Sequence, residues 1–418
     1  MIDLISKNKK TKIITRFIGT SKDSYNIQNI LSSIIEELSI EFHLEIDTIQ
    51  LSIDKIYDYF KSFIIKTALE NKEIMFYFVL DSLDQLEKEN DARKLGWLPV
   101  EDLPSNVRFI LSTLSEDEYE AYPILFSTFA TPSQRSGFVC VLDFTIDELN
   151  ILVDSTMEFI RNYDLKIKIK TFLSMHFKEN KKNSLYSKLI LDQSFRWNAF
   201  TNLNCLILPN TTELAITSFF EYLETKLKAE FIRTALRYLT LSRKGIYFEN
   251  WNKLLSNKFE NSHFALLQLI SELRQYLLGP LFRWYHRKFI EVAKQRYCSD
   301  IDECLEAHHM ITKMFWKSQF DKNDLFWINE LPYHAIYSKD VEIVKENFLL
   351  NIEFMKIKID VAGVDELIND YVIAKNNFSD SCFSVLHTCL VASSPNLRID
   401  SKNLTNELLG NFLVITKS

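Results

Sequence analysis

Apolar residues in the first part of the chain follow two different periods. Residues 24–42 and 53–70 place apolar side chains at helical spacing, and Ser24 is suited to cap the first of these helices. Residues 12–19 are typical of a strand that ends at a glycine, residues 74–81 form a continuous apolar run, and residues 107–113 and 138–142 are further strands of this kind. Runs that are apolar throughout predict strands covered on both faces, as in a parallel sheet. We therefore expect an α/β domain over residues 1–145.

The pattern becomes helical after Leu142. Thr145 and Glu148 form a Thr-x-x-Glu capping box, which predicts a helix to about residue 164. No helix or strand is assigned to residues 165–210. Beyond them, helical spacing predicts helices at residues 212–243, 249–255, 262–278, 286–297, 301–320, 325–338, 341–350, 364–375 and 380–413. The predicted fold class is therefore α/β followed by all-α.

Composition narrows the class of protein. A chain of 418 residues predicts two to four domains. Only 7 glycines and 8 prolines argue against a β-sandwich, a propeller or a disordered chain. The net charge of −7 gives no support for broad nucleic-acid binding. The 6 cysteines form no CxxC pair, and neither a signal peptide nor a long apolar run is found, which predicts a soluble cytoplasmic protein.

The apolar run at residues 74–81 carries the clearest chemical signal. It ends in Asp81, and Asp84 follows one short turn later. P-loop NTPases use a buried strand of this kind to bring a carboxylate to the Mg²⁺ ion beside the nucleotide phosphates. Asp81 is the candidate metal residue, and Asp84 is the candidate catalytic residue that positions the attacking water. The alternative is an aspartate that only caps the next turn.

The phosphate-binding half of such a site is missing from the sequence. A P-loop requires Gly-x-x-x-x-Gly-Lys-[Ser/Thr], whose backbone N–H groups hold the phosphates. No two of the seven glycines have this spacing, and Arg243-Lys244-Gly245 pairs lysine with glycine in the wrong order. We therefore expect no tight binding of ATP or ADP and no Mg²⁺ retained by this chain.

Five ordered segments resemble NACHT and WD-repeat proteins, which belong to the STAND group of AAA-like NTPases. The segments are RFIGTS (16–21), LDSLDQL (80–86), WLP with LPSNVR and LST (97–113), LFRWYHRKF (281–289), and ELPYH with AGVDEL (330–367). In that family the second segment is the Walker B motif and the fourth ends a winged-helix domain. The resemblance spans nearly the whole chain.

The resemblance implies a switch controlled by bound nucleotide rather than a metabolic enzyme. It implies a partial NTPase core at residues 1–145, a helical domain at 146–225, a winged helix at 226–298 and a helical linker at 299–418. His286 falls where related switches often place a histidine that faces the nucleotide phosphate; its alternative is a helix-start histidine satisfied by its neighbours. ATP or ADP with Mg²⁺, protein partners and homo-oligomers are the ligands and partners that the family implies.

The sequence also departs from the family pattern. The P-loop with its strand and the WD repeats are missing, so we expect a parallel sheet of four strands at most and an incomplete gene product. The missing strand separates the runs at residues 107–113 and 138–142, which must pair directly or come apart. Leu114 follows Ser112-Thr113 where relatives often have arginine, which puts phosphate sensing at that point in doubt.

Three other functions are compatible with particular residues. Cys298, Cys304, His308 and His309 suggest zinc, but their spacing matches no common finger, and core thiols with surface histidines are the simpler interpretation. A winged helix with basic residues such as Arg283 and Arg287 is able to read DNA, although the acidity of the chain argues against it. The main alternative to a nucleotide-controlled switch is a non-catalytic helical module that binds proteins.

Overall fold

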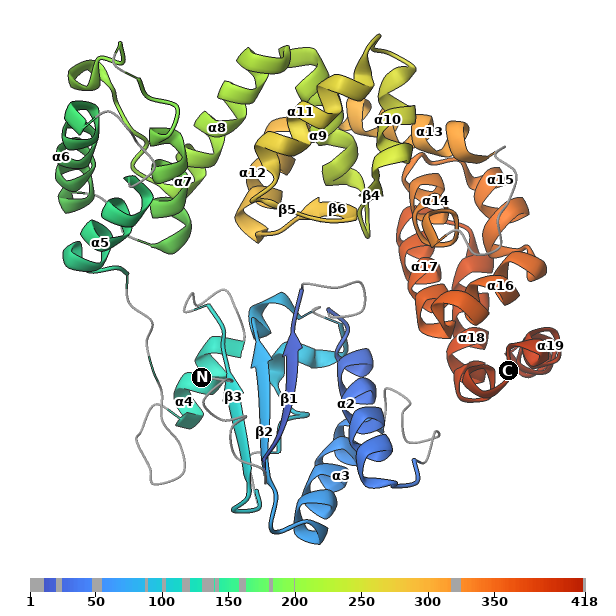
Figure 1. Cartoon of the computed structure of the whole chain (residues 1–418). Helices are drawn as coiled ribbons and strands as arrows, with labels where there is room; N and C mark the ends of the chain where they lie inside the picture. Colours follow the sequence, from blue (N-terminus) through green and yellow to red (C-terminus); the bar gives the residue numbers. More distant parts are fainter. Residues whose placement is uncertain are drawn as a thin grey trace. The chain divides into compact units, whose positions relative to one another are not determined.

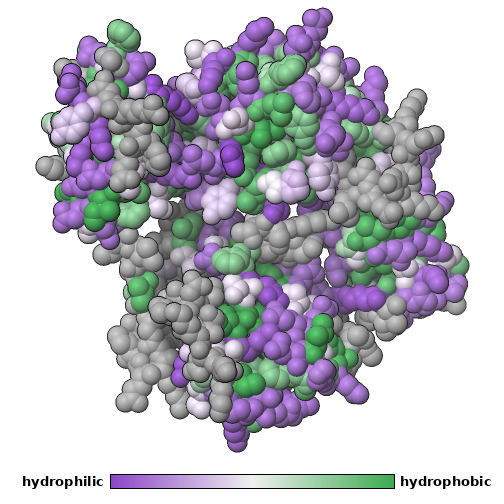
Figure 2. All heavy atoms as spheres, viewed as in Figure 1, coloured by the Kyte–Doolittle hydropathy of each residue, from purple (hydrophilic) through white to green (hydrophobic). Residues whose placement is uncertain are grey.

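The chain folds into two compact units. One contains residues 1–139 and 385–418, and the other contains residues 140–384. The computed structural model describes residues 11–19, 25–46, 55–86, 89–99, 103–114, 121–129, 139, 143–157, 163–179, 183–198, 200–316 and 325–415. Hydrophobic residues appear on the face in Figure 2 as patches between hydrophilic ones. None of the helices described is long and apolar enough to cross a lipid bilayer.

A three-stranded parallel sheet forms the centre of the first unit (Figure 1). Its strands are β1 (Thr11–Phe17), β2 (Met75–Asp81) and β3 (Val107–Leu111), in the order β1-β2-β3. Three of the four predicted strands are therefore confirmed, and the predicted α/β part precedes a mostly helical chain. The fourth, at residues 138–142, lies outside the described residues except for Val139.

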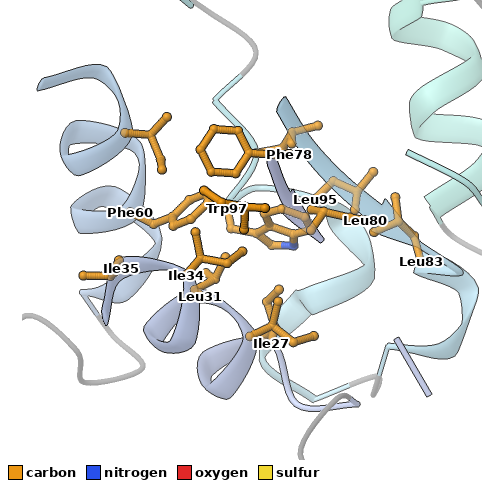
Figure 3. Close-up of a cluster of buried hydrophobic side chains, with 14 of the residues drawn as sticks. Ile27, Leu31, Ile34, Ile35, Phe60, Phe78, Leu80, Leu83, Leu95 and Trp97 are labelled. Carbon is orange, nitrogen blue, oxygen red and sulfur yellow. The ribbon is translucent and has the colours of Figure 1, made fainter. Parts of the chain in front are cut away.

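Two helices pack on this sheet. The helices α2 (Ile27–Phe42) and α3 (Ile56–Glu70) agree with the prediction, but the side chain of Asn26 caps α2, while Ser24 lies outside the described residues. Phe60 of α3 meets the fully buried Trp97 edge-on (Figure 3). The predicted burial of β2 on both faces is wrong in part. Phe76, Phe78 and Leu80 are buried, whereas the alternate residues of β2 are only partly covered.

A buried asparagine fixes the far end of the sheet. The Asn106 Nδ2 atom donates to the carbonyl oxygens of Ala68, Asn71 and Ile74 at 2.9, 3.2 and 3.0 Å. These bonds tie the end of α3 and the start of β2 to the loop before β3. Short helical turns η2 (Leu83–Gln85) and η3 (Glu89–Lys94) and the helix α4 (Ala121–Phe129) complete this part.

The second unit begins with the predicted capping box. The Thr145 N–H and hydroxyl both lie 2.8 Å from the Glu148 carboxylate, and the Glu148 N–H donates back to the Thr145 hydroxyl at 3.3 Å. This arrangement starts α5 (Ile146–Met157), and residues 158–162 of the predicted helix lie outside the described residues. Residues 165–210, to which no element was assigned from the sequence, include most of α6 (Tyr163–Glu179), α7 (Ser184–Ser194) and the turn η4 (Leu203–Cys205).

The single helix predicted at residues 212–243 is wrong. The structure has α8 (Thr212–Leu227) and α9 (Ala229–Leu241), separated by Lys228 with φ 69° and ψ 124°. A lysine with positive φ ends helical hydrogen bonding, and nothing in its side chain signals this conformation.

A small antiparallel sheet follows α9. The elements are β4 (Ile246–Tyr247), α10 (Phe248–Ser256), α11 (Ser262–Leu273), β5 (Leu277–Leu278), β6 (Leu281–Trp284) and α12 (Arg287–Tyr297), with sheet order β4-β6-β5. The helix predicted at residues 262–278 therefore ends at Leu273, and its last residues form β5. Gly245 has φ +121°, and a Cβ there would lie 2.7 Å from the Phe282 carbonyl oxygen, so only glycine fits without a shift.

The described residues beyond α12 are mostly helical, as predicted, but the helices are divided differently. The elements are α13 (Ile301–Trp316), α14 (Leu325–Tyr337), α15 (Val341–Val344), the π-helix η5 (Lys345–Leu349), α16 (Ile352–Ala362) and α17 (Val364–Asn377). The helix α16 was missed. The predicted tract at residues 380–413 is divided into α18 (Ser381–Ile399), η6 (Ser401–Asn403) and α19 (Leu404–Ile415).

Candidate functional site at the end of the parallel sheet

The carboxyl ends of the three parallel strands meet at one edge of the first unit. Phe17 pairs with Asp81, and Leu80 pairs with Leu111. Two hydrogen bonds continue the pairing past the strands, from Ile18 N–H to the Asp81 carbonyl at 3.0 Å and from Leu83 N–H to the Ser112 carbonyl at 2.9 Å. In open parallel sheets, ligands bind outside this edge.

Asp81 is held at the edge by a neighbouring strand end. Its Oδ1 atom accepts a hydrogen bond from the Ser112 hydroxyl, and the same hydroxyl accepts the Ser82 N–H at 2.8 Å. Ser82 has φ 66°, which turns the chain sharply after β2. Ser112 thus fixes one carboxylate oxygen and the following turn together. The sequence placed Ser112 at a strand end but did not identify this role.

Asp84 lies deeper than its neighbour. Only 3% of its surface is exposed. Its Oδ1 atom accepts the Leu114 N–H at 3.3 Å, and its Oδ2 atom accepts the Gln85 side-chain amide at 3.2 Å. Asp84 therefore ties the turn after β2 to the segment after β3. The structure brings both predicted acids to the same edge, but it gives them different surroundings.

Gly19 closes the edge at the end of β1. It has φ +82°, and a Cβ added there would lie 3.0 Å from the Gln85 Cβ atom. The backbone of residue 19 therefore packs directly against the Gln85 side chain. A larger residue would have to push Gln85 away, and Gln85 is the amide that supports Asp84.

His286 belongs to the second unit. It is the residue before α12, and its Nδ1 atom accepts the Lys288 N–H at 3.1 Å. Because Nδ1 acts as the acceptor, the neutral ring carries its proton on Nε2. His286 thus has the capping role that the sequence offered as an alternative, and Nε2–H is its donor toward any further group.

A cavity of about 310 Å³ is found within the second unit. It is lined by aromatic and polar side chains of α7 and α8, by the segment after α7, and by Tyr276. The Arg196 guanidinium lies 3.8 Å from the Tyr222 ring centroid, and the Tyr276 hydroxyl donates to Asp192. Burial raises the pKa of the Asp192 carboxyl above its usual value. No pattern in the sequence indicates this cavity, because the residues that line it are distant from one another along the chain.

The zinc hypothesis concerned four residues that the structure separates. The Cys304 thiol lies 3.5 Å from the Cys298 carbonyl oxygen, whereas the His308 Nδ1 atom lies 2.7 Å from the His334 Nδ1 atom. His308 is buried rather than on the surface, which corrects the prediction, and burial lowers its pKa to about 2. His309 is exposed as predicted. Within the described parts of the chain, no three His, Cys, Asp or Glu residues form a metal-binding group.

Comparison with known proteins places these features in context. NACHT and WD repeat domain-containing protein 2 from Homo sapiens is 23% identical over 341 residues, which is 72% of this chain and 18% of that protein. The chain is a distant relative of NACHT and WD-repeat proteins. NACHT domain- and WD repeat-containing protein 1 is 20% identical over 87% of this chain in Homo sapiens and 21% identical over 98% in Mus musculus.

The similarity to these NACHT and WD-repeat proteins covers only part of them. The chain spans 26% of the length of the human protein 1 and 29% of the mouse protein 1. No protein-family model matches the chain. The resemblance noticed in the sequence is therefore supported at the level of distant homology.

Proposed function

We propose that the chain supplies part of a nucleotide-controlled signalling switch of the NACHT and WD-repeat type. The observation that carries the proposal is Asp81, fixed by Ser112 at the carboxyl end of the middle parallel strand. A carboxylate in this position is what P-loop NTPases use to orient Mg²⁺ beside the phosphates. The distant similarity to NACHT and WD-repeat proteins supports the same assignment.

Each acid has a distinct role in this proposal. Asp81 orients Mg²⁺ through its water shell. Asp84 is the residue that would position the attacking water, and its hydrogen bonds to Leu114 and Gln85 would have to open first. Because the sequence holds no Gly-x-x-x-x-Gly-Lys-[Ser/Thr], most phosphate donors are missing. We therefore propose that this chain alone binds ATP or ADP weakly and does not hydrolyse ATP at a useful rate.

The proposed domains are a partial NTPase core (1–145), a helical domain (146–225), a winged helix (226–298) and a helical linker (299–418). The element order α9-β4-α10-α11-β5-β6 supports the third of these, because a winged helix has one helix, a strand, two helices and a two-stranded wing. The Nε2–H group of His286, directly after β6, is the proposed donor to a nucleotide phosphate.

The second candidate is a non-catalytic module that binds other proteins. Its support is the outer face of α11, where Phe264 is 71% and Leu267 is 46% exposed. The helix α11 contains no lysine or arginine, so this face lacks the charge that contacts to DNA phosphate require. These residues favour protein partners over the DNA-reading alternative.

Nucleotide binding distinguishes the two candidates. Fluorescent ADP titrated with the full chain in excess Mg²⁺ should show weak binding, in the millimolar range, that requires the metal. Asp81→Asn should abolish it, whereas Asp58→Asn should not, because the Asp58 side chain is 93% exposed on α3. Sub-micromolar affinity would overturn the proposed weak binding. Equal binding by Asp81→Asn and the unchanged chain would remove Asp81 from the site.

His286 requires variants that separate binding from helix capping. Asparagine caps helices well and alanine does not. His286→Asn should therefore keep the stability of α12 while losing the contribution of the imidazole to ADP affinity. His286→Ala should lose both. If His286→Asn binds ADP as the unchanged chain does, the histidine is a structural cap.

A further inference from the structure

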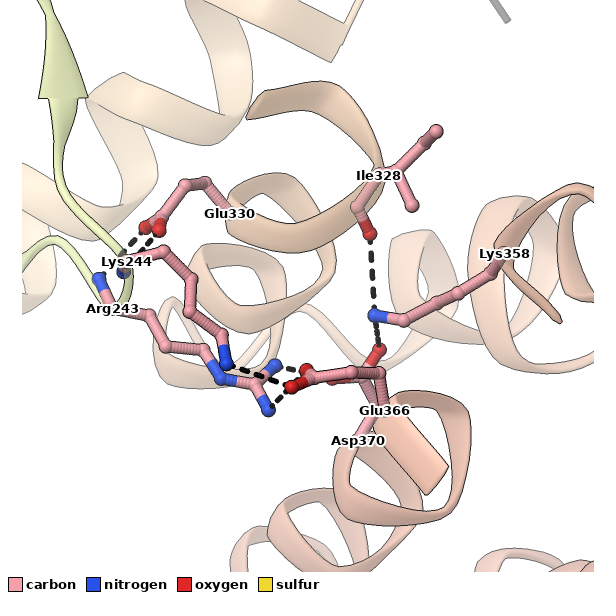
Figure 4. A network of polar contacts seen from close by, with 7 residues as sticks. All are labelled: Arg243, Lys244, Ile328, Glu330, Lys358, Glu366 and Asp370. Atoms are coloured by element: carbon pink, nitrogen blue, oxygen red, sulfur yellow. Dashed lines mark hydrogen bonds and ion pairs between the residues drawn. The ribbon is translucent and has the colours of Figure 1, made fainter. Parts of the chain in front are cut away.

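A buried arginine in the turn between α9 and β4 reaches a distant helix. Arg243 has a side chain that is 9% exposed. Its Nη1 atom donates to Asp370 Oδ1 at 2.7 Å, and its Nη2 atom donates to Glu366 Oε2 at 3.1 Å (Figure 4). The two acids lie four residues apart on α17 and therefore share one helix face. One side chain thus joins positions more than 120 residues apart.

The same turn is also bound to α14. Glu330 is 1% exposed and accepts the backbone N–H groups of Arg243, at 2.8 Å, and of Lys244. The Lys244 ammonium donates to Glu366 Oε1 at 2.7 Å. Glu330 therefore fixes the backbone of the turn, while α17 fixes its two side chains.

Lys358 of α16 completes the network. Its side chain is fully buried, pairs with Asp370 Oδ2 and donates to the Ile328 carbonyl at 3.2 Å. The network then contains three basic side chains, Arg243, Lys244 and Lys358, and three carboxylates, Glu330, Glu366 and Asp370, although burial lowers the pKa of the Lys358 ammonium. Although burial opposes its ionisation, Arg243 and Lys244 lower the pKa of Glu366 to about 2.

Further contacts connect the same two groups of helices. Arg237 of α9 donates through Nε to the Tyr297 carbonyl at 2.8 Å and forms an ion pair with Glu303 of α13. Lys253 of α10 lies 5.1 Å from the ring centroid of Phe315, also in α13. The contact between α9–α12 and α13–α17 therefore extends along α9, the turn after it and α10.

Partial opening of this network is unfavourable. If Arg243 left, the carboxyl groups of Glu366 and Asp370 would remain in a buried site with fewer partners. Water cannot solvate a charged group there until the helices separate, so an uncompensated buried charge is costly. Polar networks of this kind are stable when complete and unstable when partly broken. The network should open as a whole or remain closed.

We propose that this network is a lock that makes α9–α12 and α13–α17 move as one rigid body. The predicted domain boundary at residues 298 and 299 is then not a hinge. Any rotation of the proposed winged helix carries the C-terminal helices with it. This inference rests on the contacts themselves and does not require the proposed function.

Hydrogen exchange of the full chain tests the lock. In the unchanged chain, residues 246–256 and 364–377 should show the same opening free energy and the same urea dependence, because they open together. In Arg243→Gln the opening free energies of the two segments should differ, and residues 364–377 should exchange at least about tenfold faster than residues 246–256. Lys258 forms an ion pair with Glu230 in which the two side chains are 57% and 71% exposed. The control variant Lys258→Gln should therefore leave the opening free energies of the two segments equal.

A second variant keeps the test decisive if Arg243→Gln does not fold. Arg243→Lys retains the charge but cannot donate to both acids in the planar arrangement of a guanidinium. Arg243→Lys should give a smaller difference in exchange between the two segments, with residues 364–377 again the faster. Different urea dependence of the two segments in the unchanged chain would overturn the lock. So would variants of Arg243 that speed exchange equally in both segments.

Discussion

Arg296 holds Glu224 through two parallel hydrogen bonds, from Nε to Oε1 at 2.8 Å and from Nη2 to Oε2 at 3.1 Å. The Tyr297 hydroxyl donates to the same Oε1 atom at 3.1 Å. This carboxylate on α8 therefore fixes the position of α12. A paired guanidinium and carboxylate in this geometry bind more strongly than a single contact.

Removing the guanidinium should destabilise the second unit. We expect Arg296→Gln to lower the free energy of unfolding by about 1–3 kcal/mol, because Glu224 is largely buried and would lose its charged partner. Arg233 also approaches Glu224, at 3.5 Å, but its side chain is 59% exposed. Arg233→Gln should therefore change stability by less than about 0.5 kcal/mol. Urea denaturation measures both, and equal losses would contradict the assignment.

The contact between Gly19 and Gln85 predicts a coupled pair of substitutions. Gly19→Ala should cost about 1–3 kcal/mol, because the positive φ is strained for alanine and the new Cβ meets Gln85. In a Gln85→Ala background only part of that cost should disappear, because the contacts with Cγ at 3.1 Å and Oε1 at 3.4 Å are removed while the contact with the Gln85 Cβ atom at 3.0 Å stays. The backbone part should remain. A double-mutant cycle by chemical denaturation would show no coupling if the two residues do not touch.

Both removal of the Asn106 side-chain amide and its replacement by a hydrogen-bond acceptor should destabilise the chain. We expect Asn106→Ala to cost about 1–3 kcal/mol, since three carbonyl oxygens lose a shared donor. Asn106→Asp should cost more, although its shape is nearly the same, because an acceptor then faces three acceptors. Thermal or urea unfolding gives the order. An aspartate variant as stable as the alanine variant would show that the donor is not what matters.

Glu366 gives a pH dependence with a defined sign. Its pKa is about 2 in the folded chain against an ordinary value of 4.5. Between these values the unfolded chain binds the proton first, so the contribution of Glu366 to stability is complete above pH 4.5 and is lost as the pH falls toward 2. The difference in stability between the unchanged chain and Glu366→Gln should therefore shrink over that range. Glu260→Gln, at an exposed position before α11, should show little difference at any pH.

Local signals in the sequence were sufficient for the three parallel strands, for α2 and α3, and for the capping box that begins the second unit. The apolar run ending in Asp81 and the capping box at Thr145 depend on residues close in the chain, and both were predicted. The break at Lys228 and the strand at Leu277 were not, because tertiary packing overrides helix propensity there. The missed helix α16 follows a π-helical turn that no simple period describes.

The sequence identified single residues of the candidate site but not the contacts that surround them. Asp81 and Asp84 were identified because a strand delivers them to a sheet edge. Their different surroundings depend on the register of β2 with β3, which places Ser112 beside one and Leu114 beside the other. The Arg243 network was missed for the same reason. Its partners are 87 to 127 residues away, and only the fold brings them together.

The burial of Asp84 affects the order in which ligands would load at the sheet edge. Both carboxylate oxygens of Asp84 already accept hydrogen bonds, so Asp81 is the more accessible of the two acids. One oxygen of Asp81 accepts a hydrogen bond from Ser112. A single carboxylate leaves most of the positions around an octahedral Mg²⁺ to other oxygens. The ion would therefore arrive already chelated by a polyphosphate, and free Mg²⁺ would not collect at this edge beforehand.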